Sequence, residues 1–211
     1  QEIKGSLLMV DIIKQAIRAW QTVLAEPVTI RVDGTPFAVT PQMTRRARGR
    51  ARASRRPHNR ARQIFHDKLV EEIVNAYAAE IGTDPTQPDR PGLLLSASDY
   101  ADLTEDLLNS PEVQALVEDN WPILTAPQVV ERLLTDRRHL EEASHTILSD
   151  DDVDYLLRAK DSPFTVPDVP LLDEAAEQLG RPPRPRKATA GGENWQQMVE
   201  DAQDALCLLY T

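Results

Sequence analysis

Residues 40–77 read TPQMTRRARGRARASRRPHNRARQIFHDKLVEEIVNAY and predict two consecutive helices. The first is expected to start at Thr40 and Pro41, because threonine is a favoured N-cap and proline is tolerated at the first helical position. The segment Ser54–Pro57 should break it, and the second helix should begin at His58 or Asn59. The second helix has apolar residues at helical spacing, which predicts a buried face formed by Ile64, Phe65, Leu69, Ile73, Val74 and Tyr77.

The residues before this stretch are expected to form a helix and a β-hairpin. Residues 6–25 have the apolar spacing of an amphipathic helix, which Pro27 would end. Two short segments of alternating polarity then flank Asp33 and Gly34, a pair that favours the positive φ angles of a tight hairpin turn. Because an isolated hairpin is only marginally stable in water, we expect it to pack on the preceding helix.

The residues after this stretch show helical signals almost throughout. Residues 83–92 contain three prolines and are expected to form a linker between subdomains. Polar or proline-containing helix starts then precede apolar periodic segments at 96–108, 110–121, 125–134, 136–147 and 149–157. Residues 163–170 are expected to be extended, and residues 171–179 to form a short helix that Gly180 ends.

These patterns predict a mainly α-helical fold with two subdomains and one small β-hairpin. Residues 1–92 would form a subdomain of helix, hairpin and basic helices, and residues 93–180 a second, helical subdomain. Residues 181–211 would add a mobile loop at 181–194, rich in proline and arginine, and a C-terminal helix. No apolar run approaches the ~18 residues of a membrane helix, so no membrane partner is expected. Because Gln1 is not a usual first residue, we expect the sequence to be part of a longer protein.

The composition argues against several kinds of catalytic or metal site. The only cysteine among the 211 residues is Cys207, which excludes a disulfide framework and a multi-cysteine zinc site and is consistent with a cytoplasmic location. His139 and His145 are wrongly spaced for two ligands on one helix face. None of the eight glycines belongs to a phosphate-binding loop, and no nucleophile motif is present. We therefore expect no catalytic residue, metal or cofactor within this chain.

Two acidic clusters have a structural explanation that we prefer to a metal site. Residues 150–152 are three aspartates after Ser149, and acids in a first helical turn are stabilised by the helix dipole. Asp173 and Glu174 resemble the acidic pair that holds magnesium in nucleoside triphosphatases. They are expected to open a helix instead of ending an apolar strand, so we interpret them as a dipole feature as well.

The arginine-rich segment is the strongest candidate for a binding surface. Between Pro41 and Lys68 lie nine arginines and one lysine against one aspartate, which gives +9 in a chain of net charge −10. It is either a surface for a polyanion (nucleic-acid phosphates or an acidic protein face) or a solvated face that balances the acidic second half within the molecule. We favour the first, because solvated faces usually mix charges of both signs. The predominance of arginine over lysine favours bidentate contact with carboxylate or phosphate. No aromatic residue interrupts the segment, which argues against base stacking. The candidates are Arg45, Arg46, Arg48, Arg50, Arg52, Arg55, Arg56, Arg60 and Arg62.

Several segments resemble one family. Residues 164–180, FTVPDVPLLDEAAEQLG, closely resemble a segment of the actinobacterial HelD proteins, superfamily 1 ATPases that are similar to the UvrD/Rep helicases and bind RNA polymerase. Residues 123–134 and 147–157 look like the helices that precede this segment in the family. Lys4 and Gly5 with the following helix, the hairpin and residues 45–59 also look like the family pattern.

The resemblance implies a non-catalytic insert in the first ATPase domain of a HelD-like parent protein. The insert would lie after the phosphate-binding loop and before the magnesium-binding acidic motif, so ATP and magnesium would bind in the rest of the parent ATPase domain. In this family the insert wedges open the polymerase clamp, which implies that RNA polymerase is the partner and that the chain helps release it from nucleic acid. The alternative is a DNA-binding accessory domain of a true UvrD/Rep-like helicase, with DNA as the partner.

The resemblance also implies a loop that enters the primary channel of RNA polymerase. In this chain it would span residues 181–204, after the helix at 171–179. Its basic residues precede its acidic ones, so it departs from a purely acidic mimic of DNA. For that reason we do not infer that this loop contacts the polymerase active centre. The candidate residues are Arg184, Arg186, Lys187, Glu193, Glu200, Asp201 and Asp204.

Overall fold

The computed structural model describes residues 3–81, 96–145 and 147–181. Over these residues the protein is mainly α-helical with one antiparallel hairpin, which confirms the expected fold class. The elements are α1 (Leu8–Ala19), β1 (Val28–Val32), β2 (Thr35–Val39), α2 (Pro41–Ala53), α3 (His58–Ile81), α4 (Ala97–Asn109), α5 (Pro111–Asn120), α6 (Ala126–Thr135), α7 (Arg137–Ser144), α8 (Asp150–Leu156), the 3-10 turn η1 (Val166–Asp168) and α9 (Val169–Leu179).

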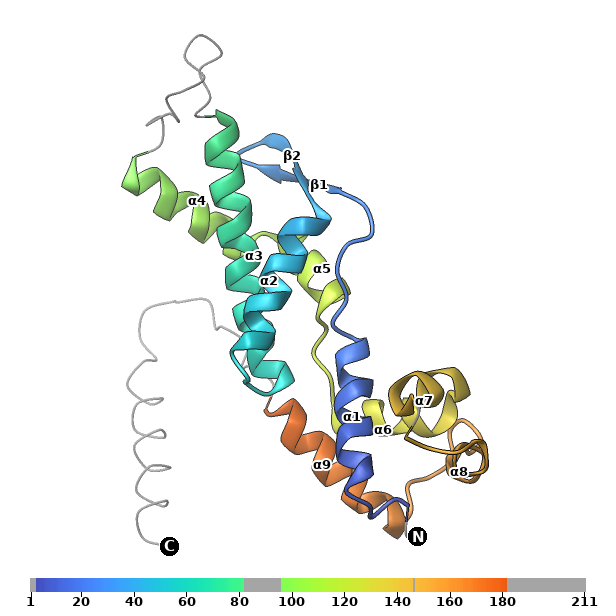
Figure 1. Cartoon of the computed structure of the whole chain (residues 1–211). Helices are drawn as coiled ribbons and strands as arrows, with labels where there is room; N and C mark the ends of the chain where they lie inside the picture. The colour runs from blue at the N-terminus through green and yellow to red at the C-terminus, as the bar shows by residue number, and fades with distance from the viewer. Residues whose placement is uncertain (1–2, 82–95, 146, 182–211) are drawn as a thin grey trace, which may run out of the picture.

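The helices α2 and α3 lie side by side and form the middle of an elongated molecule (Figure 1). The break between them falls at residues 54–57, as expected, and α3 begins at His58. The predicted apolar face of α3 is confirmed: Phe65, Leu69 and Ile73 are fully buried, and Ile64 is the one member that is only partly buried. The facing side of α2 consists of the small buried residues Thr44, Ala47 and Ala51, so the two helices can approach closely.

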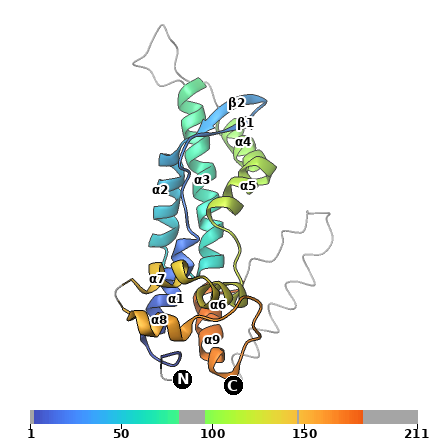
Figure 2. The same cartoon turned by 90° about the vertical axis from the view of Figure 1, so that its right-hand side faces the viewer.

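Two clusters of buried residues make up the core, and neither is continuous in sequence. The first joins the hairpin, α2, α3, α4 and α5 around Trp121, whose ring stacks on Phe65 with centroids 5.4 Å apart. The second joins α1 to α6, α7, α8 and α9 (Figure 2). Because α1 packs with helices from the far end of the chain, each cluster draws on both sides of the expected linker. Residues 83–92 lie outside the described residues, and the division at residue 92 stays a prediction.

The prediction that the hairpin packs on the preceding helix is wrong. The turn at Asp33 and Gly34 has the expected positive φ angles, 48° and 73°. The hairpin itself packs on α3 and α5: Phe37 meets Tyr77 edge to face with centroids 5.8 Å apart, and the backbone N–H of Arg31 donates to Glu112 Oε2 at 2.5 Å. It cannot pack on α1, because α6, α7 and α9 already cover the apolar face of that helix.

The end of α1 also differs from the prediction. The helix ends at Ala19 instead of continuing to residue 25. Beyond it, the backbone N–H of Thr22 donates to Asn120 O at 2.9 Å, and that of Leu24 donates to Thr44 Oγ1 at 3.3 Å. The backbone therefore leaves the helix to bond with α5 and α2, contacts that are distant in sequence.

The start of α9 is a third difference. Residues 163–170, expected to be extended, contain η1 and the first residues of α9, because Thr165 donates both its backbone N–H and its hydroxyl to Asp168 Oδ2 and closes a turn. Since α9 begins at Val169, Asp173 and Glu174 lie in its second turn, and the interpretation that they open the helix is wrong. In contrast, the aspartates at 150–152 do occupy the first turn of α8, whose N-cap Ser149 accepts from Asp152 N.

Candidate binding surface

The nine predicted arginines lie on α2, on the turn that follows it and on the first turns of α3. We call them the arginine surface: Arg45, Arg46, Arg48, Arg50, Arg52, Arg55, Arg56, Arg60 and Arg62. The small residues of α2 face α3, so the arginines of α2 are left on the sides of the helix that this packing does not use. They do not act as one group, and their partners divide them into three sets.

Three arginines pair with glutamates. Arg46 lies 3.2 Å from Glu72 and Arg50 lies 3.8 Å from Glu71, which joins α2 to α3. Arg62 reaches α5, where its Nη2 lies 2.8 Å from Glu118 Oε2 and its Nε donates to Trp121 O at 2.9 Å. Exposed pairs of this kind contribute about 0–1 kcal/mol each, so they stabilise the fold only slightly. Within the described residues, these three are the only members of the arginine surface that pair with an acidic side chain.

Two arginines hold the end of α1. Arg48 donates to Gln21 O at 3.0 Å, and Arg52 donates to Gln21 Oε1 at 2.7 Å and to Arg18 O at 3.3 Å. The last carbonyl groups of a helix have no partner within the helix and carry partial negative charge, so a guanidinium is a suitable partner there. Burial lowers the pKa of Arg52, and the neighbouring Arg48 and Arg18 lower it further. These two arginines are structural: they join the two buried clusters.

The remaining four arginines have no side-chain partner among the described residues. Arg45, Arg55, Arg56 and Arg60 are exposed, and none forms an ion pair or donates a side-chain hydrogen bond within the described ranges. Arg55 is also unusual in its backbone, which has a φ of 56° in the left-handed region that side chains with a Cβ rarely adopt. These four side chains are therefore free to bind a partner.

Two of these four arginines, Arg55 and Arg56, line a groove. It has a volume of about 590 Å³ and lies between α1, the turn from α2 to α3, and α9. Its positively charged lining comes from Lys14 and Arg18 of α1 and from Arg52, Arg55 and Arg56. Two residues of α9, Glu174 and Glu177, contribute negative charge. The sequence pattern identified the arginines on α2 and the turn, whereas Lys14 and Arg18 join them only because the end of α1 meets the end of α2.

Buried polar residues at the start of α3 hold the walls of the groove together. Gln21 Nε2 donates to His58 Nδ1 at 3.2 Å, and His58 Nε2 donates to Pro122 O at 2.8 Å. Burial lowers the pKa of His58, the bond to Pro122 opposes this shift, the charge of Arg62 adds to it, and together they bring the pKa to about 4. Asn59 Nδ2 donates to Gly180 O at 3.0 Å, which fixes the end of α9. Sequence patterns did not identify this joint, because nothing local distinguishes a buried histidine or asparagine from an exposed one.

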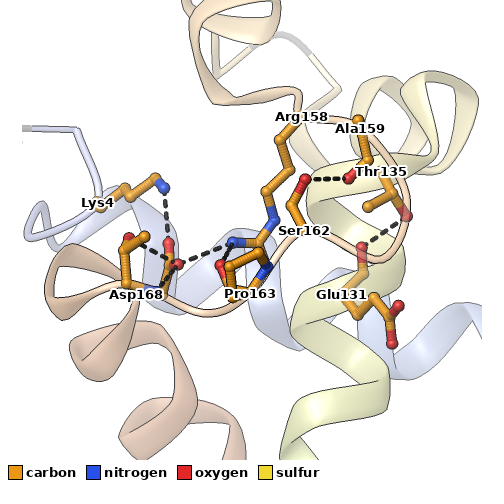
Figure 3. A network of polar contacts seen from close by, with 9 residues as sticks. Lys4, Glu131, Thr135, Arg158, Ala159, Ser162, Pro163 and Asp168 are labelled. Atoms are coloured by element: carbon orange, nitrogen blue, oxygen red, sulfur yellow. Dashed lines mark hydrogen bonds and ion pairs between the residues drawn. The ribbon is translucent and has the colours of Figure 1, made fainter.

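A second polar joint lies at the opposite end of α9 (Figure 3). The carboxylate of Asp168 is fully buried and accepts from Lys4 Nζ at 2.6 Å and from Arg158 Nη1 at 2.9 Å, in addition to Thr165. Burial alone would raise the pKa of Asp168, but the hydrogen bonds from Lys4 and Thr165 outweigh it and lower the pKa to about 2. A carboxylate that stays ionised and fully bonded at neutral pH is suited to fastening the N-terminal segment, not to proton transfer.

Other predicted sites can be placed only in part. Within residues 3–81, 96–145 and 147–181, no group of three or more His, Cys, Asp or Glu side chains is arranged to hold a metal ion. In the same residues no helix is both long and apolar enough to cross a membrane. The channel-loop candidates, from Arg184 to Asp204, and the expected C-terminal helix lie outside the described residues.

Comparisons with known proteins do not assign a family. No protein-family model matches the sequence, and no curated protein matches it significantly.

Proposed function

We propose that this chain is a non-catalytic domain inserted in a HelD-like ATPase, that it binds RNA polymerase in the cytoplasm, and that it helps release the polymerase from nucleic acid. ATP and magnesium would bind to the parent ATPase domain outside this chain. The choice of RNA polymerase as the partner rests on the resemblance of residues 123–134, 147–157 and 164–180 to that family.

The observation that carries a binding function is the set of unpaired arginines. Among the described residues Arg45, Arg55, Arg56 and Arg60 are exposed and have no carboxylate partner, although the chain outside the arginine-rich segment has a net charge of −19. A chain with that many acids could have neutralised these side chains by folding against them. Unpaired arginines are suited to attracting and orienting an anionic partner. Such electrostatic attraction raises the rate and the specificity of association more than it raises the affinity.

The alternative is that the same surface binds DNA as an accessory domain of a UvrD/Rep-like helicase. Free arginines at a groove would also suit phosphates, which supports this alternative. Against it, Trp121, the tryptophan among the described residues that line the groove, is fully buried and cannot stack on a base. The negative charge of the rest of the chain would also repel a polyanion as long as DNA.

Binding of the purified chain to core RNA polymerase and to duplex DNA, each at two salt concentrations, tests the proposal. We expect tighter binding to the polymerase and an affinity that falls with added salt. The triple variant Arg45→Ala/Arg56→Ala/Arg60→Ala should bind about tenfold more weakly and with a smaller salt dependence. The control Arg31→Ala/Arg138→Ala/Lys160→Ala removes the same charge from exposed positions elsewhere and should bind within about twofold of the unmodified chain. Preference for DNA, or an equal loss in the control, would overturn the proposal.

A further inference from the structure

We propose that the groove between α1, the α2–α3 turn and α9 binds an acidic peptide segment of the partner protein. The proposal rests on the proposed function for the identity of the partner, and it adds the chemistry that the partner must present. Its starting point is that two separate elements, α1 and the α2–α3 turn, direct basic side chains to one groove of about 590 Å³.

The basic side of the groove is suited to carboxylates. Lys14 and Arg18 are four residues apart on α1 and therefore lie on the same face of that helix. Arg55 and Arg56 approach the same groove from the turn. None of these four side chains has a carboxylate partner within the part of the chain that the structure describes. A guanidinium binds a carboxylate through two parallel hydrogen bonds, so a segment with several acids could engage this side at more than one point.

The rest of the groove selects a peptide over a nucleic acid. Glu174 and Glu177 of α9 contribute to its lining, and their charges would repel a phosphodiester chain, which bears a negative charge at every nucleotide. A peptide can place an uncharged or basic residue there instead. Val10 and Pro57 add apolar atoms to the lining, which suits an aliphatic side chain next to the acids. The volume also falls in the range of sites that enclose a substantial ligand, and it is too large for a single ion.

The backbone at Arg55 has the left-handed conformation with which helices such as α2 commonly end. With a φ of 56°, this position would be filled most favourably by glycine, which has no Cβ to clash with the backbone. An arginine here is therefore less favourable than glycine. This difference supplies a test, because Arg55→Gly removes the guanidinium and relieves the backbone at the same time. Loss of binding in this variant cannot then be attributed to loss of folding.

Fluorescence anisotropy of the full chain with a short labelled peptide of repeated Asp-Glu-Leu triplets tests the proposal directly. The matched probe replaces the acids with Asn and Gln, and a third probe is a labelled single-stranded oligonucleotide. We expect the acidic peptide to bind about tenfold more tightly than either of the other probes. Arg55→Gly and Arg56→Ala should each weaken peptide binding about fivefold, with the thermal midpoint of Arg55→Gly unchanged or higher. The control variant Arg45→Ala, outside the groove, should bind the peptide as the unmodified chain does.

The outcomes separate this proposal from the proposed function. Failure of the acidic peptide to bind, tighter binding of the oligonucleotide, or full peptide affinity in both groove variants would overturn the groove as an acidic-peptide site. Peptide binding with no affinity for RNA polymerase would support the groove and overturn the proposed function. If the polymerase binds the unmodified chain and both groove variants equally, the proposed function stands and the groove proposal fails.

Discussion

Acidification should destabilise this protein through His58, by about 3 kcal/mol in total. In the folded chain His58 is buried, accepts from Gln21 and donates to Pro122, and burial lowers its pKa from 6.5 to about 4. The unfolded chain takes up a proton at this residue below pH 6.5, whereas the folded chain does not until about pH 4. The stabilising contribution is therefore complete above pH 6.5 and is lost as the pH falls toward 4. At about 1.36 kcal/mol per pKa unit, the gap corresponds to about 3 kcal/mol.

Urea unfolding between pH 7.5 and 4.5 measures this effect. We expect the free energy of unfolding to fall by about 2–3 kcal/mol over this range, with most of the loss below pH 6. The variant His58→Gln should be less stable at neutral pH, because it disturbs buried hydrogen bonds, but its stability should depend less on pH. Burial and the charge of Arg132 also lower the pKa of His139. The companion variant His139→Gln should therefore remove a separate part of the dependence of the unfolding free energy on pH. An unfolding free energy in the unmodified chain that is independent of pH over this range would refute the reasoning.

Three substitutions test the contacts that hold the helices of this protein together. Gly180→Ala should cost about 2–3 kcal/mol in urea unfolding, because φ is +66° and a Cβ would lie 2.7 Å from Pro57 Cβ. The control Gly49→Ala has open space in a helix interior and should gain up to about 1 kcal/mol; equal effects of the two would contradict this account. Asp168→Asn should cost about 3 kcal/mol by leaving Lys4 and Arg158 without a carboxylate, and a loss below about 1 kcal/mol would show that the joint is dispensable. Arg52→Ala should lower the unfolding free energy by about 1–2 kcal/mol through its lost bonds to the end of α1, whereas Arg45→Ala should leave it unchanged.

Local signals in the sequence determined most of the secondary structure. The helix starts at Ser96, Ser110, Thr125 and Ser149 and the break between α2 and α3 were predicted correctly. Capping side chains, prolines and apolar periodicity act within a few residues, so a single sequence is enough to recognise them. The concentration of arginine in one segment is likewise a property of the sequence alone.

Only the tertiary structure decided which elements meet and which arginines are free. The hairpin packs on α3 and not on α1, since the apolar face of α1 is covered by helices that follow a hundred or more residues later. Arg48 and Arg52 are bound to the end of α1, whereas Arg55 and Arg56 line a groove that α9 completes. These arginines are chemically identical along the chain, and periodicity and propensity carry no information about partners brought together by folding. Long-range packing assigns each charge its neighbour, and thereby separates the arginines that contact other parts of this protein from those that have no partner among the described residues.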